Sequence, residues 1–225
     1  MVDVVDEKAK SWGAVNTIVF ETTNAAGQWV PVGAKDSAPD GEVRSRGFNT
    51  DADAIVQALK EAFDLTGLRG KSVLLLGAGG AGRAAALRLA REGLEALCLV
   101  NRTESKVAEL AAEIAKISPE LRVVPGYPGR AVDIVINATS LGLKAGDAVP
   151  IDTQWLHAHR PKFVYDMIYR PMETSLLRTA REAGCKTANG AGMLLHQGAR
   201  SLELWTGRSA PVDVMRDALR KNLYG

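Results

Sequence analysis

Three glycines, Gly77, Gly79 and Gly82, repeat at the spacing Gly-x-Gly-x-x-Gly. They stand between an apolar run at 72–76 and a segment with a helical pattern. In that setting the first glycine allows a tight turn, the second lets the backbone approach a pyrophosphate, and the third lets helix and strand pack closely. The start of the helix also offers free N–H groups to phosphates. We therefore predict a dinucleotide site formed by Gly77, Ala78, Gly79, Gly80, Ala81 and Gly82; the alternative is a turn that only joins strand to helix.

The residues that end the next apolar run, 96–100, indicate which dinucleotide is bound. Enzymes that use NAD usually place Asp or Glu about 20 residues after the glycines, where the carboxylate binds the ribose 2′-hydroxyl. Here Asn101, Arg102 and Thr103 follow the run, with Lys106 one helical turn later. A guanidinium can hold a phosphate with two charge-assisted hydrogen bonds, and a threonine can donate from its hydroxyl or cap the next helix. We predict NADP as the cofactor; the alternative is a solvated turn with ordinary surface charges.

The elements that must position these residues alternate between strand and helix. Strands are predicted at 72–76, 96–100, 122–124, 133–136, 163–166 and 186–188, with helices at 51–63, 81–92, 104–117 and 173–183. Such alternation implies a parallel sheet with right-handed crossovers. The expected fold class is therefore α/β, with a doubly wound, Rossmann-type sheet. Outside this unit we expect the end of a helix at 2–12, strands at 14–20 and 29–32, a long and partly disordered connection at 21–46, and helices at 193–205 and 212–223.

Composition excludes several classes of protein. The 225 residues are 46% hydrophobic and 24% charged, with a net charge of +2, as in an ordinary globular protein. No basic block suggests nucleic acid, and no apolar run is long enough to cross a membrane. Cys98 and Cys185 lie in strand-like runs without metal-ligand spacing, so we expect unpaired, buried thiols, no metal, and a cytoplasmic location.

Further blocks of sequence accompany the two nucleotide motifs. They are Gly-Ala-Val-Asn-Thr at 13–17, Asn-Thr-Asp at 49–51, Asn-Ala-Thr-Ser-Leu-Gly at 137–142, Tyr-Asp-Met-Ile-Tyr-Arg-Pro at 165–171, and a segment from Asn189 to Gly198. In this order the blocks closely resemble the shikimate dehydrogenase family, from about residue 4 to the C-terminus. That resemblance implies NADPH-dependent reduction of 3-dehydroshikimate to shikimate, on the route to chorismate and the aromatic amino acids.

The resemblance also implies roles for particular residues. Asp51 matches the catalytic aspartate, and the substrate is expected to meet Asn16, Thr17, Asp51, Tyr169 and Gln197. Thr139 and Ser140 match the loop beside the cofactor, and Gly190 and Met193 match residues near the nicotinamide. A polyol acid needs many directed hydrogen bonds, which Asn, Thr, Gln and Tyr can supply. Reducing a ketone also requires a proton donor and stabilisation of the nascent alkoxide.

Each of these side chains has a purely structural alternative. Asp51 could be only the N-cap of the following helix, and Asn16 a turn residue at the end of a strand. Gln197 could be a solvated helical residue, and Tyr169 an aromatic at the edge of the core.

The sequence departs from the family at its beginning. The family has an Asn-Val-Thr-x-Pro-x-Lys segment with a catalytic lysine before the block at 13–17, and this chain has none. We expect an N-terminally truncated member, with a remnant substrate domain at 1–50, an NADP-binding domain at 51–189, and helices at 190–225 that return to the remnant and bring Gln197 to the cleft. Loss of an acid–base partner typically costs roughly 10²–10⁴-fold in rate, so we expect NADPH binding with slow turnover. Exposed sheet edges should leave residues 1–50 poorly packed or drive self-association, for example as a homodimer.

Two other functions remain open at this point. One is a catalytically inactive NADP-binding module that acts as a sensor or scaffold, which the missing lysine favours. The other is a quinate/shikimate dehydrogenase that uses NAD, against which Asn101 and Arg102 argue.

Overall fold

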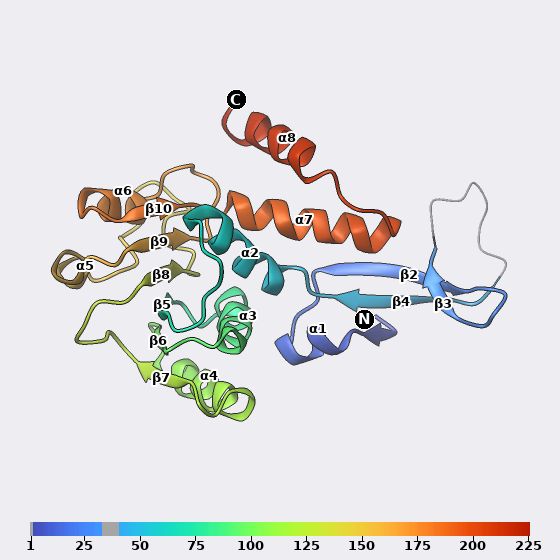
Figure 1. The fold of residues 1–225 in the computed structure, drawn as a ribbon, viewed down its shortest axis with the longest axis horizontal. Coiled ribbons are helices and arrows are strands. Elements are labelled where there is room, and N and C mark those ends of the chain that lie inside the picture. The colour runs from blue at the N-terminus through green and yellow to red at the C-terminus, as the bar shows by residue number, and fades with distance from the viewer. Residues whose placement is uncertain (1, 33–40) are drawn as a thin grey trace.

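A six-stranded parallel sheet forms the larger part of the molecule (Figure 1). The computed structural model describes residues 2–32 and 41–225. The strand order is β10-β9-β8-β5-β6-β7, and every neighbouring pair is parallel. The strands are β5 (Ser72–Leu76), β6 (Ala96–Val100), β7 (Arg122–Pro125), β8 (Ile134–Asn137), β9 (Phe163–Asp166) and β10 (Lys186–Ala188). This order reverses between β5 and β8, as in a doubly wound fold, so the predicted fold class is confirmed.

Helices cover both faces of this sheet. Val73 and Leu75 point into a core shared with α2 (Asp51–Phe63), α3 (Gly80–Leu89) and α4 (Glu104–Ile117). Leu74 and Leu76 point into the opposite core, shared with α5 (Thr153–His159) and α6 (Ser175–Glu182). Burial on both faces explains why these strands are unbroken apolar runs. Helices were predicted within two residues of the observed α2, α4 and α6, and 81–92 proves to be α3 followed by a 3₁₀ turn, Ala90–Glu92; α5 was not predicted.

A second, four-stranded sheet holds the N-terminal part of the chain. Its order is β1-β4-β2-β3, with β1 (Val4–Val5), β2 (Thr17–Thr23), β3 (Trp29–Pro31) and β4 (Val43–Phe48). The prediction of one helical segment at 2–12 is wrong at its start. Residues 4–5 pair with β4 instead, and the Asp6 carboxylate caps α1 (Glu7–Trp12) by accepting from the N–H of Lys8 at 3.0 Å.

The predicted connection at 21–46 is wrong at both ends, because β2 runs on to Thr23 and β4 begins at Val43. Ion pairs between the two strands account for their polar sequence. The Glu21 carboxylate is buried and lies 2.7 Å from a guanidinium nitrogen of Arg44 and 3.6 Å from one of Arg46. The part of the predicted connection at 33–40 lies outside the described residues.

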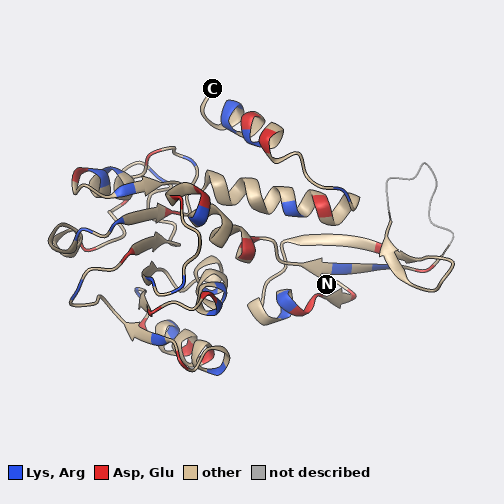
Figure 2. Cartoon of the chain, viewed as in Figure 1, with Lys and Arg blue, Asp and Glu red and all other residues tan. Residues whose placement is uncertain are grey.

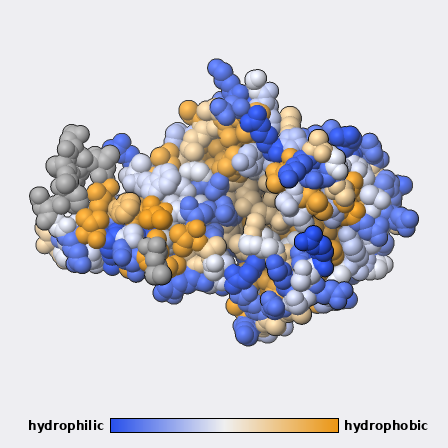
Figure 3. Space-filling model, turned by 180° about the vertical axis from the view of Figure 1, so that it is seen from behind, coloured by the Kyte–Doolittle hydropathy of each residue, from blue (hydrophilic) through white to orange (hydrophobic). Residues whose placement is uncertain are grey.

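One face of the four-stranded sheet is apolar and open. Ile18, Phe20 and Val43 are 44%, 61% and 46% exposed. Seen from behind, apolar side chains gather over this sheet (Figure 3). The opposite face is packed, since Val19 is buried. The expected self-association of residues 1–50 stays a prediction.

Two C-terminal helices follow β10, close to where they were predicted: α7 (Ala191–Thr206) and α8 (Val212–Tyr224). The far end of α7 reaches the four-stranded sheet, where the Trp205 indole donates to the Ile18 carbonyl at 2.9 Å. Lys, Arg and Asp residues lie along α8, whereas the first half of α7 has no Lys, Arg, Asp or Glu (Figure 2). Within the described part of the chain, no helix combines the length and apolar character needed to span a membrane.

Candidate active site

The glycine-rich turn joins β5 to α3 at the carboxyl edge of the large sheet. Gly77 has a φ of 101°, and a Cβ there would lie 3.1 Å from the Ala138 backbone. A Cβ on Gly82 would lie 2.1 Å from the Gly77 carbonyl oxygen, so only glycine lets α3 start this close to the strand. By contrast, Gly79 and Gly80 face open space, with no atom within 4 Å of a Cβ.

The start of α3 can therefore receive a phosphate. No side chain caps this helix at Gly79, which leaves the first N–H groups of the helix and the positive end of its dipole available. The open cradle at Gly79 and Gly80 fits the pyrophosphate of a dinucleotide.

Asn101 fixes the turn rather than facing solvent. Its side-chain oxygen accepts from the N–H of Ala78 at 3.0 Å, and its amide donates to the Thr103 carbonyl at 3.0 Å. The amide thus ties the glycine turn to the turn after β6. Arg102 and Lys106 remain exposed beside it. Thr103 occupies the N-cap position of α4, but its hydroxyl makes no capping hydrogen bond, so the predicted cap is wrong and the hydroxyl remains available to a ligand.

Buried polar side chains position the loop after β8. The Asn137 side-chain oxygen accepts from the Thr139 hydroxyl at 2.8 Å, and its amide donates to Asp166 at 2.9 Å. Asp166 also accepts from the Thr174 hydroxyl at 2.7 Å and from the N–H of Ile168 at 3.1 Å. Both Asn137 and Asp166 are fully buried. Burial raises the pKa of Asp166, although these hydrogen bonds offset part of the rise.

This network was not predicted to have a functional role. It holds Thr139 beside the glycine turn, where a Cβ on Gly77 would lie 3.0 Å from the Thr139 methyl group, while Ser140 stays exposed on the same loop. The sequence did contain a sign of this network, an Asn and an Asp at the carboxyl ends of two apolar runs. Polar side chains that are buried at such positions must find hydrogen-bond partners.

Helix α7 begins against the end of β9. A Cβ on Gly190 would lie 2.0 Å from the Met167 carbonyl oxygen, and the N–H of Gly190 donates to the Ile168 carbonyl at 3.0 Å. Glycine at this position lets the first turn of α7, with Met193, approach the edge of the sheet.

A cavity of about 230 Å³ lies between these elements. Seven of the predicted site residues line it: Asp51, Ala81, Thr139, Tyr169, Gly190, Met193 and Gln197. They come from segments that are far apart in sequence and meet at the point where strand order reverses, the usual place for ligands in such sheets.

Asp51 is the first residue of α2, not its cap. Thr50 occupies the N-cap position without a side-chain bond, and the Asn49 side chain accepts from the N–H of Ala52 at 3.1 Å. The alternative of Asp51 as an N-cap is therefore wrong. Burial raises the pKa of Asp51 above its usual range, and a hydrogen bond from Asn16 offsets part of the rise.

Replacing Asp51 by Asn is expected to raise the free energy of unfolding at neutral pH. A carboxyl whose pKa is raised by folding binds its proton more tightly in the folded state. At a pH above that raised pKa, the ionised carboxylate therefore lowers the free energy of unfolding. This cost disappears below the ordinary pKa of Asp, about 3.9. Denaturant unfolding of both chains at about pH 7 and about pH 4 measures the effect. An advantage of Asn that is equal at the two pH values would contradict it.

Asn16 directly precedes β2, and Thr17 is the first residue of that strand. The Asn16 amide donates to the Thr50 hydroxyl at 3.1 Å and lies 3.5 Å from the Gln197 side-chain oxygen. Thr17 is buried, with its hydroxyl 2.8 Å from that of Ser201 on α7. The structure thus brings Asn16 to the mouth of the site, whereas Thr17 joins β2 to α7 and does not line the cavity.

Comparisons with known proteins agree with this geometry. The sequence profile "Shikimate / quinate 5-dehydrogenase" matches residues 57–144, and "Shikimate 5'-dehydrogenase C-terminal domain" matches residues 190–220. The chain is 40% identical over 230 residues to a shikimate dehydrogenase (NADP(+)) of Moorella thermoacetica, covering 98% of this chain and 69% of that protein.

Solved structures show the same likeness. Shikimate 5-dehydrogenase from Thermus thermophilus, in complex with NADP(H) and shikimate, superposes with a TM-score of 0.76 at 35% identity, covering 99% of this chain and 73% of that one. Quinate dehydrogenase from Corynebacterium glutamicum, in complex with NAD, superposes with a TM-score of 0.75 at 30% identity, covering 98% and 72%.

Proposed function

The chain belongs to the shikimate dehydrogenase family, and on that premise we propose that it catalyses the NADPH-dependent reduction of 3-dehydroshikimate to shikimate. This reaction serves the synthesis of chorismate and the aromatic amino acids. The single observation that supports the proposal best is the cavity in which Asp51, Tyr169 and Gln197 meet Gly190 and Met193.

We assign the cofactor to the carboxyl edge of the large sheet. The uncapped start of α3 would hold the pyrophosphate of NADP, and Arg102, Thr103 and Lys106 would hold its 2′-phosphate. Thr139, Ser140, Gly190 and Met193 would border the nicotinamide. In this proposal residues 51–189 bind NADP, and residues 1–50 bind the substrate together with 190–225.

The chain's own side chains would position the substrate and handle the proton. When bound, NADPH supplies a hydride to the carbonyl carbon. Asp51 acts as an acid–base group at the carbonyl oxygen, and its raised pKa brings its titration nearer to neutral pH than that of an ordinary Asp. Asn16, Tyr169 and Gln197 offer amide and phenol groups to the hydroxyls of the substrate.

Replacing Gln197 by Ala is expected to weaken shikimate binding by about 10-fold. The side chain lies in the cavity and would leave a substrate hydroxyl without its partner, a loss of roughly 1–2 kcal/mol. Calorimetric titration with shikimate in the presence of NADP+ measures it. Gln154→Ala, an exposed glutamine on α5, is the matched control and should bind shikimate as the parent does. Equal affinities for shikimate in all three proteins would show that Gln197 does not bind the substrate.

Titration with each ligand tests the proposal as a whole. Tryptophan fluorescence and NADPH formation are followed on addition of shikimate or quinate, with NADP+ or NAD+. The proposal expects shikimate to bind and NADP+ to be reduced in a shikimate-dependent way. Binding of NADP+ without binding of shikimate supports the inactive module instead, and preference for quinate with NAD+ supports the quinate enzyme. The expectation of slow turnover stays a prediction, which a rate close to that of the relatives would contradict.

Two further features belong to the same proposal. Cys98 and Cys185 are buried free thiols, which suits a reducing, cytoplasmic setting. The apolar face with Ile18, Phe20 and Val43 suits association into a homodimer.

A further inference from the structure

A larger hollow lies on the other side of α7 from the catalytic cavity. It has a volume of about 800 Å³ and is lined by residues of α2, α6, α7, α8, β9 and β10. Ala191, Gly192 and Leu195 of α7 face this hollow, whereas Met193 and Leu194 face the catalytic cavity. The two spaces are therefore separate, and the hollow has the size of a small-molecule site.

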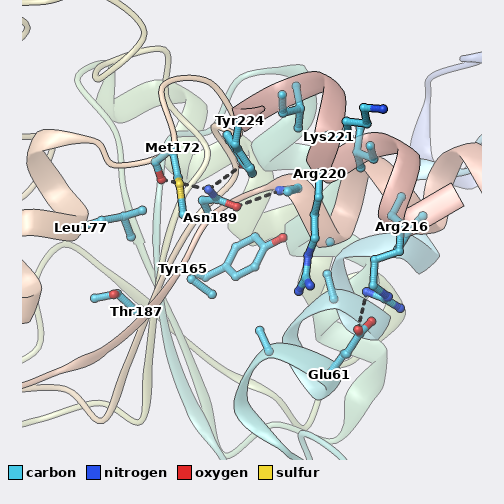
Figure 4. A pocket seen from close by; sticks show the side chains of 18 of the residues that line it. Glu61, Tyr165, Met172, Leu177, Thr187, Asn189, Arg216, Arg220, Lys221 and Tyr224 are labelled. Atoms are coloured by element: carbon cyan, nitrogen blue, oxygen red, sulfur yellow. Dashed lines mark hydrogen bonds and ion pairs between the residues drawn. The ribbon is translucent and has the colours of Figure 1, made fainter. Parts of the chain in front are cut away.

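The Tyr165 hydroxyl is the most unusual group in its wall. Tyr165 is fully buried in β9, and within the described chain its hydroxyl donates to no acceptor. Figure 4 shows the phenol pointing into the hollow from the edge of the sheet. Burial raises the pKa of this phenol, and the nearby backbone N–H of Met193 offsets only part of the rise. The phenol therefore stays in the neutral form, which can donate a hydrogen bond. A buried donor without an acceptor costs stability, so this hydroxyl points to a ligand that accepts from it.

Arg220 supplies an unpaired positive charge opposite this hydroxyl. Its guanidinium reaches down from α8 toward Tyr165 (Figure 4), and the described residues offer it no ion pair. Lys221 of α8 also lines the hollow and makes no ion pair within the described residues, whereas the remaining charged side chains of the wall are engaged. Glu61 lies 2.5 Å from Arg216 and 2.6 Å from His196, and Arg181 pairs with Glu173.

Most of the remaining wall is apolar, and Thr187, Asn189 and Tyr224 are its polar members. The apolar residues include Ala58, Leu177, Ala188, Leu195, Leu219 and Leu223. A ligand that suits the hollow therefore needs an apolar body as well as an anionic group, because the wall offers surface that only apolar atoms can cover favourably.

We propose that this hollow is a second ligand site, for a small organic carboxylate with an apolar body of about the size of an aromatic ring. The carboxylate accepts two hydrogen bonds from the Arg220 guanidinium and one from the Tyr165 hydroxyl. The body lies against Leu177, Leu195 and Leu219. The site stands apart from the proposed reaction, since its ligand touches neither Asp51 nor Gln197.

The test uses 3-phenylpropionate as the probe, titrated into the full 225-residue chain and followed by NMR, with NADP+ and shikimate present at saturation. We expect a dissociation constant on the order of 1 mM for a ligand of this size. The neutral 3-phenylpropionamide, which has the same shape, and acetate, which lacks the body, should each bind at least about 10-fold more weakly.

Two variants locate the binding. Arg220→Gln should weaken 3-phenylpropionate by about 10-fold or more, and Tyr165→Phe by roughly 3- to 10-fold. Tyr165→Phe should not lower the Tm, because it removes only a hydroxyl that donates to no partner in the free protein. Arg208→Gln, an exposed arginine in the loop between α7 and α8, is the matched control and should bind the probe as the parent does.

Several outcomes would overturn the proposal. They are no detectable binding at probe concentrations far above the expected dissociation constant, binding of the probe only when shikimate and NADP+ are left out, equal affinity for the amide, and unchanged affinity in both variants. Failure of this test leaves the dehydrogenase proposal untouched, because that proposal is measured through shikimate and NADP+ alone.

Discussion

Asp51→Asn is expected to lower kcat for shikimate oxidation by roughly 10²- to 10⁴-fold, the usual contribution of a positioned acid–base group. The carboxyl lies in the cavity with Tyr169 and Gln197, and burial raises its pKa. Asn has the same shape and can keep a hydrogen bond to Asn16, but it cannot take or give a proton. The rate of NADPH formation at saturating shikimate and NADP+ measures the effect, and the fluorescence titration shows whether shikimate still binds.

An aspartate directly after the same helix provides the control. Asp64 is the C-cap of α2 and has a left-handed conformation with a φ of 52°, which Asn adopts readily. Asp64→Asn removes the same charge and should leave kcat within about 2-fold of the parent, since surface substitutions of this kind change little. If Asp51→Asn binds shikimate and its kcat stays near the parent value, Asp51 is not an acid–base group of the reaction.

The large sheet was predictable because its signals are local. Ser72–Leu76 and Ala96–Val100 are continuous apolar runs of strand length that end at glycine or polar residues, and both are observed at the predicted bounds. Burial on both faces requires such runs. Helix α5 was missed because it is only one to two turns long, and its stability depends on burying Trp155 against the core.

The N-terminal sheet was less predictable because its signals are non-local. Strand β4 has the sequence Val-Arg-Ser-Arg-Gly-Phe, which does not look like a buried strand. The arginines fit only because Glu21, more than twenty residues earlier, is buried between them. A short-range pattern cannot show such a pairing, so the segment was expected to be a connection.

The same distinction separates the site residues. The turn from Gly77 to Gly82 could be interpreted from spacing alone, because each glycine has a steric role within the segment. Thr17 could not, since its hydroxyl is 2.8 Å from that of Ser201, 184 positions away in the chain. Family resemblance supplied Asp51 and Gln197, and the fold then brings them into one cavity.

Arg102→Gln is expected to weaken NADPH binding by roughly 10- to 100-fold while leaving NADH binding within about 2-fold, so that the preference between the two narrows by the same factor. A charge-assisted hydrogen-bond pair to a phosphate is worth roughly 1.5–3 kcal/mol. Arg102 is exposed at the carboxyl edge of the sheet, directly after Asn101, whose amide is already used to hold the glycine turn. In the proposed placement of the cofactor the guanidinium is therefore the group expected to discriminate the 2′-phosphate, and calorimetry with both coenzymes measures its contribution.

A second arginine, far from the proposed cofactor site, provides the control for loss of a positive charge. Arg122→Gln removes an exposed arginine at the opposite, amino-terminal end of β7, and it should change neither coenzyme affinity by more than about 2-fold. An exposed ion pair is screened by salt. The difference in NADPH affinity between the parent and Arg102→Gln should therefore shrink as ionic strength rises, whereas the difference in NADH affinity should stay small at every ionic strength. An unchanged ratio of NADPH to NADH affinity in Arg102→Gln at low salt would mean that other groups read the 2′-phosphate, and Lys106 and Thr103 would be the next residues to test.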